Sequence, residues 1–201
     1  MKLFYAPPSP FARKARIVAR ERNLMDRVEE IVANPFQDDP NLLAVNPAGL
    51  VPALVLDDGT PLLDSRLICQ HLDAIADGPT LIPNQSGERW RVLNHGALGD
   101  LIMDFALSVV VETRRTDASP SATFIARKVA KIERCLAALP VTPDMATLTL
   151  GDINAATALA YLDFRLPDLD WRSLRPDLAP WHDAIEQRPA FIATQPADHI
   201  G

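Results

Sequence analysis

The chain has 201 residues, of which 48% are apolar and 23% charged, the balance of an ordinary globular protein with one or two cores. It has no stretch of about 18 apolar residues that could span a bilayer, and a formal net charge of −6 disfavours nucleic acid as a partner. The N-terminus lacks the long apolar stretch of a secretory signal, so we expect a cytoplasmic protein without a membrane segment.

Residues 2–6 have the composition of a short strand, which two prolines then end. Ser9 followed by Pro10 is typical of a helix start, with the serine as N-cap and the proline in the first turn. A second strand is predicted over residues 28–32. Residues 33–50 are interpreted as a loop with at most one helical turn.

A buried strand is predicted over residues 50–56, and the turn at residues 57–59 (DDG) returns the chain into a strand over residues 60–63. Asp64 and Ser65 then start a helix that closes the small sheet. The order strand, helix, strand, hairpin and helix predicts an α+β domain with a mixed sheet.

We expect two domains, over residues 1–78 and 87–201, joined by a proline-bearing linker over residues 79–86. The second domain is predicted to be helical throughout. Its helical patterns cover about residues 88–115, 121–139, a segment that begins near 148, and part of 178–188.

Basic residues crowd the first predicted helix: Arg13, Lys14, Arg16, Arg20 and Arg22. We favour a solvated helix face for them, with a local field that attracts anions as the alternative. Cys69 and Cys135 form no CxxC pair, and the histidines are not spaced as metal ligands. Buried, inert thiols and no metal site are therefore expected.

Ser9 is the first residue that could carry chemistry, because the start of a helix carries partial positive charge. A thiol held there would lose its proton more easily than its usual pKa of roughly 8.5 suggests, and a hydroxyl donor would stabilise the anion. Taken alone, Ser9 is better explained as a helix cap. Both roles are compatible, since a hydroxyl can accept one hydrogen bond and donate another.

Two further segments could bind a peptide-like ligand. A cis bond between Val51 and Pro52 would turn the Val51 amide and carbonyl outward to pair with an extended peptide, whereas a trans bond is the ordinary alternative. At the next helix start, Ser65 suits a carboxylate and Asp64 an ammonium group, which together match an α-amino acid head group. The alternative there is again a simple cap.

In order and spacing, residues 9–11 (SPF), 46–54 (NPAGLVPAL) and 64–65 (DS) resemble the glutathione transferase superfamily, in its bacterial cytosolic form with an active-site serine. Residues 149–152 (TLGD) look like the capping box of the family's helical domain, and residues 180–191 are similar to its last helix. The likeness covers essentially the whole chain. It implies a thioredoxin-like N-terminal domain, an all-α C-terminal domain, a homodimer, and glutathione as co-substrate.

The resemblance also implies roles for single residues. Ser9 would hold the glutathione sulfur, and Val51, preceding the cis Pro52, would pair with the cysteinyl backbone. Asp64 and Ser65 would bind the γ-glutamyl ammonium and carboxylate.

Four more residues take weaker roles by the same resemblance. Phe11 would be a wall or core residue, and Tyr5 ranks below Ser9 as the catalytic hydroxyl. Asp100, ahead of Asp104, would reach the same ammonium group across a dimer.

The sequence departs from the family pattern at two places. Ser9 and Ala12 occupy the positions of a glutaredoxin-like Cys-x-x-Cys, which disfavours dithiol redox chemistry. Asn34 and Gln37 stand where several classes place a lysine or histidine for the glycine carboxylate, so the affinity for glutathione is expected to be low.

Our first hypothesis is an enzyme that lowers the pKa of the glutathione thiol and presents the thiolate to a small hydrophobic electrophile, without a metal. The electrophile would lie in a cleft between the domains, floored by the long helix over about residues 100–115. The alternatives are a non-catalytic binding, scaffold or regulatory protein of the same fold, and a glutathione-dependent disulfide reductase.

Overall fold

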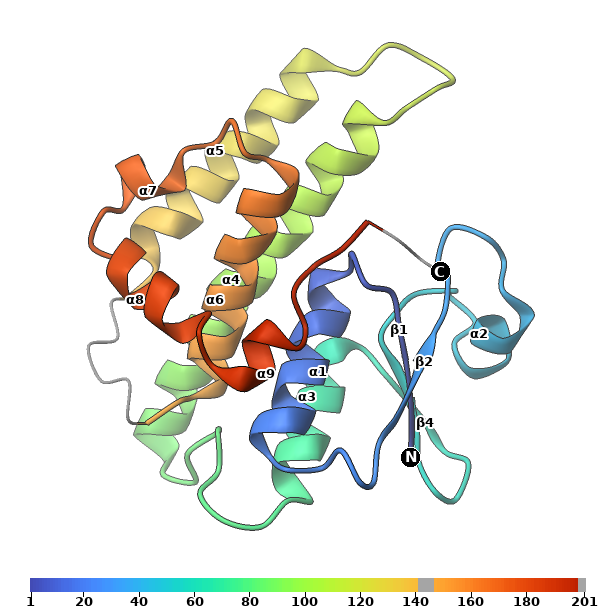
Figure 1. The fold of residues 1–201 in the computed structure, drawn as a ribbon. Helices are drawn as coiled ribbons and strands as arrows, with labels where there is room; N and C mark the ends of the chain where they lie inside the picture. Colours follow the sequence, from blue (N-terminus) through green and yellow to red (C-terminus); the bar gives the residue numbers. More distant parts are fainter. Residues whose placement is uncertain (141–146, 199–201) are drawn as a thin grey trace. The chain divides into compact units, whose positions relative to one another are not determined.

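The computed structural model of the chain describes residues 1–140 and 147–198 (Figure 1). By their contacts these residues form two compact units: Met1–Ile82 together with the segment from Arg188 onward, and Pro83–Gln187. The break after Ile82 falls inside the segment predicted as a linker. The segment from Arg188, which the sequence places in the helical domain, groups with the first unit instead. None of the described helices is long and apolar enough to cross a membrane.

The first unit is built on a mixed four-stranded sheet. Its elements are β1 (Lys2–Tyr5), α1 (Pro10–Glu21), β2 (Glu29–Val32), α2 (Pro40–Val45), β3 (Ala53–Val55), β4 (Pro61–Leu63), α3 (Ser65–Ala74) and, from the end of the chain, α9 (Pro189–Ile192). The strand order is β2-β1-β3-β4, with β1 parallel to β2 and antiparallel to β3, and β4 antiparallel to β3. The predicted thioredoxin-like α+β arrangement is confirmed.

The strand register brings several chain segments to one end of this sheet. Phe4 pairs with Ala53, and Ala53 pairs with Leu63, so β1 ends where β3 begins and where β4 ends. Tyr5 pairs with Val32, so the parallel strand β2 ends there as well. The helices α1 and α3 begin directly beyond this end, which we call the β1 end of the sheet.

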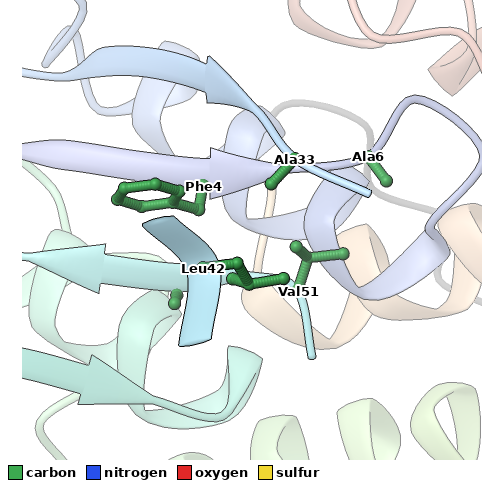
Figure 2. Close-up of a cluster of buried hydrophobic side chains, with 6 residues drawn as sticks. Phe4, Ala6, Ala33, Leu42 and Val51 are labelled. Carbon is green, nitrogen blue, oxygen red and sulfur yellow. The ribbon is translucent and has the colours of Figure 1, made fainter. Parts of the chain in front are cut away.

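A hydrophobic cluster supports the β1 end (Figure 2). Its buried members are Phe4, Ala6, Ala33, Leu42, Val51 and Ala53. Figure 2 shows Leu42, which comes from α2, beside Val51, which precedes β3. Because protein interiors are close-packed, a shift of any member would open a void. The cluster therefore fixes the residues that directly follow β1 and β2 and that precede β3, namely Ala6, Ala33 and Val51.

The prediction of a solvated basic face on the first helix is wrong. In α1 and its C-cap, Arg13, Lys14, Arg16 and Arg22 are each 8% exposed or less. Charged side chains are buried to this extent when they are paired or hydrogen-bonded. The partners of Arg13 and Arg22 come from segments 178 and more than 50 residues away, and for that reason sequence periodicity does not reveal their burial.

The C-terminal segment makes two long-range contacts with α1. Arg13 Nη2 donates a hydrogen bond to the Phe191 carbonyl at 3.3 Å, and its guanidinium lies 5.8 Å from the centre of the Phe191 ring. Arg188 forms a two-bond ion pair with the Glu21 carboxylate, at 2.6 and 2.9 Å. These contacts explain why α9 belongs to the first unit.

The second unit is all-helical in its described residues. It contains α4 (Ser86–Thr113), α5 (Ala122–Ala138), α6 (Leu150–Arg165), α7 (Trp171–Leu174) and α8 (Ala179–Ile185). The predicted capping box at the start of α6 is confirmed: Thr149 Oγ1 accepts from the Asp152 amide at 3.3 Å, and the Asp152 carboxylate accepts from the Thr149 amide at 2.9 Å. Residues 150–162 are buried throughout, so α6 forms the centre of this unit.

Candidate functional site

Ser9 lies in the turn that joins β1 to α1. Its amide donates to the Ala6 carbonyl at 2.9 Å, and its Oγ accepts from the Ala12 amide at 3.2 Å, so Ser9 is the N-cap of α1. The side chain is half-buried, and the hydroxyl hydrogen takes no part in the capping bond. Ser9 can therefore cap the helix and still donate to an anion held at the positive end of α1.

The peptide bond between Val51 and Pro52 is cis, as expected. The Val51 side chain is buried in the cluster of Figure 2. Over residues 1–140 and 147–198, no backbone hydrogen bond uses the Val51 amide or carbonyl. A backbone donor and acceptor on one residue at a strand start can pair with an extended peptide in the manner of a neighbouring strand.

Asp64 and Ser65 form the start of α3. Asp64 has a φ of +74°, a conformation that few residues other than glycine adopt and that costs of order 1–3 kcal/mol. Its carboxylate is exposed and accepts from the Arg66 amide at 2.7 Å. Ser65 is 6% exposed, and its hydroxyl has no hydrogen-bond partner among the described residues. An unused hydroxyl at a helix start is suited to an anionic ligand, and Ser65 Oγ is not among the fully buried unpaired atoms of the described residues, so a ligand can reach it.

These three places lie together at the β1 end. One residue beyond the pairs Phe4–Ala53 and Ala53–Leu63, the chain reaches Tyr5, Pro52 and Asp64. The turn that carries Ser9 leaves the sheet at this same end. The geometry thus gathers a hydroxyl donor, a backbone donor–acceptor pair, a carboxylate and a second hydroxyl at the β1 end of the sheet.

Two family models match the chain, described as the glutathione S-transferase N-terminal domain, over residues 3–80, and C-terminal domain, over residues 125–184. A relative from Escherichia coli (strain K12), named "Uncharacterized GST-like protein YibF", is 33% identical over 201 residues and is covered, like this chain, to 98%. The chain belongs to the glutathione transferase family.

Solved structures of other family members resemble this chain over nearly its full length. A family member from Pseudomonas fluorescens Pf-5, with bound glutathione, is 38% identical, with a TM-score of 0.91 and 98% of each chain covered. A glutathione S-transferase from Methylobacillus flagellatus KT, also with glutathione bound, is 32% identical, with a TM-score of 0.89 and coverage of 98% of this chain and 99% of the other.

The aromatic residues near Ser9 in the sequence, Tyr5 and Phe11, each have a cationic side chain beside the ring. The Arg16 guanidinium lies 4.1 Å from the centre of the Tyr5 ring, and Lys14 Nζ lies 5.9 Å from the centre of the Phe11 ring. Phe11 is half-buried, which suits the predicted wall residue. Tyr5 is covered on one face by a charged group, a structural contact that leaves Ser9 as our preferred catalytic hydroxyl.

Asp100 belongs to α4 in the second unit. It is 2% exposed, and its Oδ1 accepts from Asn154 Nδ2 at 3.3 Å. Asp104, one helical turn later, is exposed. A buried carboxylate held inside its own unit has an evident packing role, whereas an exposed one is accessible to a partner. By exposure, Asp104 is the better candidate for a contact with another subunit, whereas the resemblance placed Asp100 first.

Asn46 positions the loop before Val51, a role that its place in the 46–54 motif does not by itself indicate. Its Nδ2 donates to the Leu50 carbonyl at 2.7 Å, and its Oδ1 accepts from the Ala48 amide at 3.1 Å, so one buried side chain holds the loop before Val51. Gly49, with a φ of +63°, supplies the left-handed turn in this loop. The available signal was asparagine before proline, which favours such side-chain-closed turns.

Asn34 and Gln37 follow β2 at the same end of the sheet. Asn34 Oδ1 accepts from the Phe36 amide at 2.9 Å, so this side chain stabilises its own turn. Elsewhere, Cys69 is buried, and burial raises the pKa of the Cys135 thiol. In residues 1–140 and 147–198, no group of three or more histidine, cysteine or acidic side chains is arranged to hold a metal ion.

Proposed function

We propose that this protein binds glutathione at the β1 end of its sheet and lowers the pKa of the glutathione thiol for transfer to an electrophile. The observation that carries the proposal is the gathering there of groups that α-amino acid and peptide ligands require, each with bonding capacity left: the Val51 amide and carbonyl, the Ser65 hydroxyl, the Ser9 hydroxyl hydrogen and the exposed Asp64 carboxylate. The glutathione-bound structures of two relatives at 32% and 38% identity support the choice of ligand.

Recognition would use two parts of the tripeptide: the charged groups of the γ-glutamyl part and the backbone of the cysteinyl part. The Ser65 hydroxyl and the start of α3 would receive the γ-glutamyl carboxylate, and the Asp64 carboxylate would receive the ammonium group. The Val51 amide and carbonyl would pair with the cysteinyl backbone, because they are unused by the sheet.

Activation would be electrostatic. The start of α1 favours a negative charge, and the Ser9 hydroxyl can donate to the sulfur while its oxygen continues to cap the helix. The thiol proton passes to solvent, and the thiolate forms a new bond to the electrophilic carbon of the acceptor. With an aryl halide, the bond from that carbon to the halogen then breaks, and the halide leaves with the electron pair. This role needs only a hydroxyl donor, which agrees with serine and not cysteine at this position.

The remaining parts of the proposal concern partners. We propose a small hydrophobic acceptor, a cytoplasmic homodimer, and an acidic residue of α4 that reaches the γ-glutamyl ammonium of the other subunit. Of the two candidates, Asp104 is exposed and Asp100 is buried. Asp104→Asn should therefore lower glutathione affinity at unchanged fold stability, whereas Asp100→Asn should chiefly affect stability.

The test is glutathione binding by calorimetry together with conjugation to an aryl halide across pH. Ser65→Ala should weaken glutathione binding about tenfold or more, the usual effect of losing a hydrogen bond to a charged group. Ser9→Ala should bind glutathione nearly as well but react about ten- to a hundredfold more slowly at neutral pH, with the pH–rate midpoint shifted upward.

A matched control is Asp58→Ala, because Asp58 is also an exposed aspartate that caps a turn, accepting from the Thr60 amide at 2.9 Å. It lies in the β3–β4 hairpin, at the opposite end of the sheet. Asp64→Ala should weaken glutathione binding and Asp58→Ala should not. Equal effects of the two, or no measurable binding by the unmodified protein, would contradict the proposal and favour a non-catalytic scaffold.

A further inference from the structure

The strand order gives the proposed glutathione site a direction. From one edge of the sheet to the other, the order is β4, β3, β1 and β2. Asp64 and Ser65 follow β4, Val51 precedes β3, and residues 33–39, which we call the β2–α2 loop, follow β2. Ala33, the first residue of this loop, belongs to the same hydrophobic cluster as Val51 (Figure 2). A peptide with its γ-glutamyl head at Ser65 and its second residue beside Val51 therefore points its third residue toward the β2–α2 loop.

The chain that borders this end of the ligand contains no cationic side chain. Residues 28–65 run from β2 to the start of α3, and none of them is lysine, arginine or histidine. The β2–α2 loop carries two acidic side chains instead, Asp38 and Asp39. Asp39 accepts from the amides of Asn41 at 2.9 Å and Leu42 at 3.4 Å, so the first amides of α2 are already bonded to a carboxylate.

The described cationic side chains of the first unit lie elsewhere. Arg16 and Arg20 lie beyond the first turn of α1 and are hydrogen-bonded to the Glu30 carboxylate. Arg66 and His71 belong to α3, on the γ-glutamyl side. The others are buried, paired with distant segments or placed at the opposite end of the sheet: Arg13, Lys14, Arg22, Arg188, Lys2 and Arg27.

The side chains of the β2–α2 loop that could meet a third residue are neutral amides. Asn34 already closes its own turn by accepting from the Phe36 amide, and Gln37 is exposed. A neutral amide brings no opposite charge to a carboxylate, and the acidic pair that follows Gln37 repels one. A C-terminal carboxylate therefore gains little here compared with a neutral group.

We propose that the site recognises the γ-glutamylcysteinyl part of its thiol substrate and not the C-terminal carboxylate. Its substrate class then includes γ-glutamylcysteinyl peptides that are amidated or extended at this end. The proposal rests on the glutathione site proposed above, because it concerns the specificity of that site. The β2–α2 loop is open to a longer peptide: the Phe36 side chain is 71% exposed, and Gln37 and Asp38 are exposed as well.

The experiment measures, by calorimetry, the binding of three thiols to the full chain. They are glutathione, glutathione with its glycine carboxylate converted to an amide, and glutathione extended by a C-terminal lysine amide. Their dissociation constants should agree within about twofold, because the changed groups meet only exposed, neutral or screened partners. Glutarylcysteinylglycine, which lacks only the ammonium group, should bind about tenfold more weakly, because it loses the charged contact with Asp64.

Gln37→Lys adds a cation to the β2–α2 loop. It should create a preference of about fivefold for glutathione over its amide, since the carboxylate then gains an ion pair. Ala74→Lys is the matched control, because it adds the same charge at the exposed last residue of α3, at the other end of that helix from Ser65. It should leave the two thiols equal at moderate salt. If Gln37→Lys also left them equal, the third residue would lie elsewhere and the proposal would be overturned.

The same titrations separate this proposal from the proposed function. Binding of glutathione about tenfold more tightly than its amide by the unmodified protein would overturn the specificity proposal and leave the glutathione site standing. Absence of binding by every one of the thiols would overturn the glutathione site itself, and the specificity proposal with it.

Discussion

The two units bury polar groups by different means. Around α1 in the first unit, full charges are buried, and Arg13, Arg16 and Arg22 each meet a carboxylate or carbonyl from outside the helix. Around α6 in the second unit, helices approach closely because side chains are missing, as at Gly99. The buried polar groups there bond to one another, locally in the Thr149–Asp152 box and between helices where Asn154 donates to Asp100. The first arrangement depends on buried full charges and their remote partners, and the second on small side chains at the helix contacts.

This difference predicts where each unit is most sensitive. A buried charge that loses its partner is left uncompensated, so the first unit should fail when one member of a pair is removed. A close helix contact fails when atoms are added, so the second unit should be damaged by the smallest enlargements. Four measurements test whether the two units differ in this way.

The largest effect is expected for Asp73→Ala in the first unit. The Asp73 carboxylate is 4% exposed, accepts from the amides of Leu81 at 2.8 Å and Ile82 at 3.0 Å, and pairs with Arg22 at 3.1 Å. Its removal leaves the buried Arg22 guanidinium without a counter-charge, held only by the Ala76 and Pro79 carbonyls, and leaves two buried amides unpaired. We expect a loss of about 3–5 kcal/mol in the free energy of unfolding, measured by urea denaturation followed by circular dichroism.

Asp57→Ala is the control, because Asp57 also pairs with a cation, the N-terminal ammonium, at 2.7 Å. The Asp57 side chain is 81% exposed, so its pair is screened by water and its loss should have little effect. If both variants lowered stability equally, burial would not be what makes the Asp73 pair important.

The second effect is expected for Gly99→Ala in the helical unit. A Cβ atom at this position of α4 would lie 2.7 Å from the backbone carbon and oxygen of Asn154 in α6, a distance that requires the helices to separate. The expected cost is about 1–3 kcal/mol, despite the better helix propensity of alanine. Gly87→Ala, where a Cβ atom meets nothing within 4 Å, should be neutral or slightly stabilising in the same thermal and urea denaturation experiments.

The contrast between the units also explains what the sequence alone could predict. The caps at Ser9 and Thr149 and the hairpin after β3 were predicted, because each depends on residues within a few positions of one another. The cis bond before Pro52 was expected from the family resemblance, since the residues alone left a trans bond as the ordinary alternative. The burial of the basic residues of α1 could not be predicted, because Arg13 finds its partner 178 residues away. The same long-range contact places the C-terminal segment in the first unit.

The candidate site follows the same rule. Its residues were found from local motifs, and the strand register then shows that they share one end of the sheet. What the motifs could not predict is which groups remain unused, such as the Ser65 hydroxyl, or which acidic residue of α4 is exposed. Both depend on packing against elements distant in sequence.

A third, smaller effect is expected for the capping box. Thr149→Ala removes the side-chain acceptor for the Asp152 amide at the start of the buried helix α6. We expect a loss of about 1 kcal/mol in the free energy of unfolding. Ser121→Ala removes a similar cap from α5, where the bond to the Phe124 amide is exposed, and should cost less. Equal costs would mean that the burial of α6 adds nothing to its cap.

The smallest effect concerns pH, and the two units should respond in different ranges. In the helical unit, burial lowers the pKa of His95 and His182 below the usual 6.5, although carboxylates of Asp152 and Glu186, at 3.9 and 3.8 Å, oppose this. The unfolded chain therefore takes up protons near pH 6.5 while the folded unit does not. The free energy of unfolding falls as the pH drops below 6.5, by at most about 1.4 kcal/mol per histidine and pH unit.

In the first unit, the corresponding group is Glu30. Burial raises its pKa, but hydrogen bonds from Arg20 and Arg16 outweigh burial, so its pKa lies below the usual 4.5. Its contribution to stability is complete above pH 4.5 and is lost only as the pH falls through the lower folded value. Between pH 6.5 and 5 the helical unit should therefore weaken first.

Hydrogen exchange can measure each unit separately, and all three tryptophans report on the helical one, since Trp90, Trp171 and Trp181 lie there. Faster opening of α6 than of α1 over this pH range, reduced in His182→Gln, is the expected result. Equal acceleration in both helices would mean that the two units open as one.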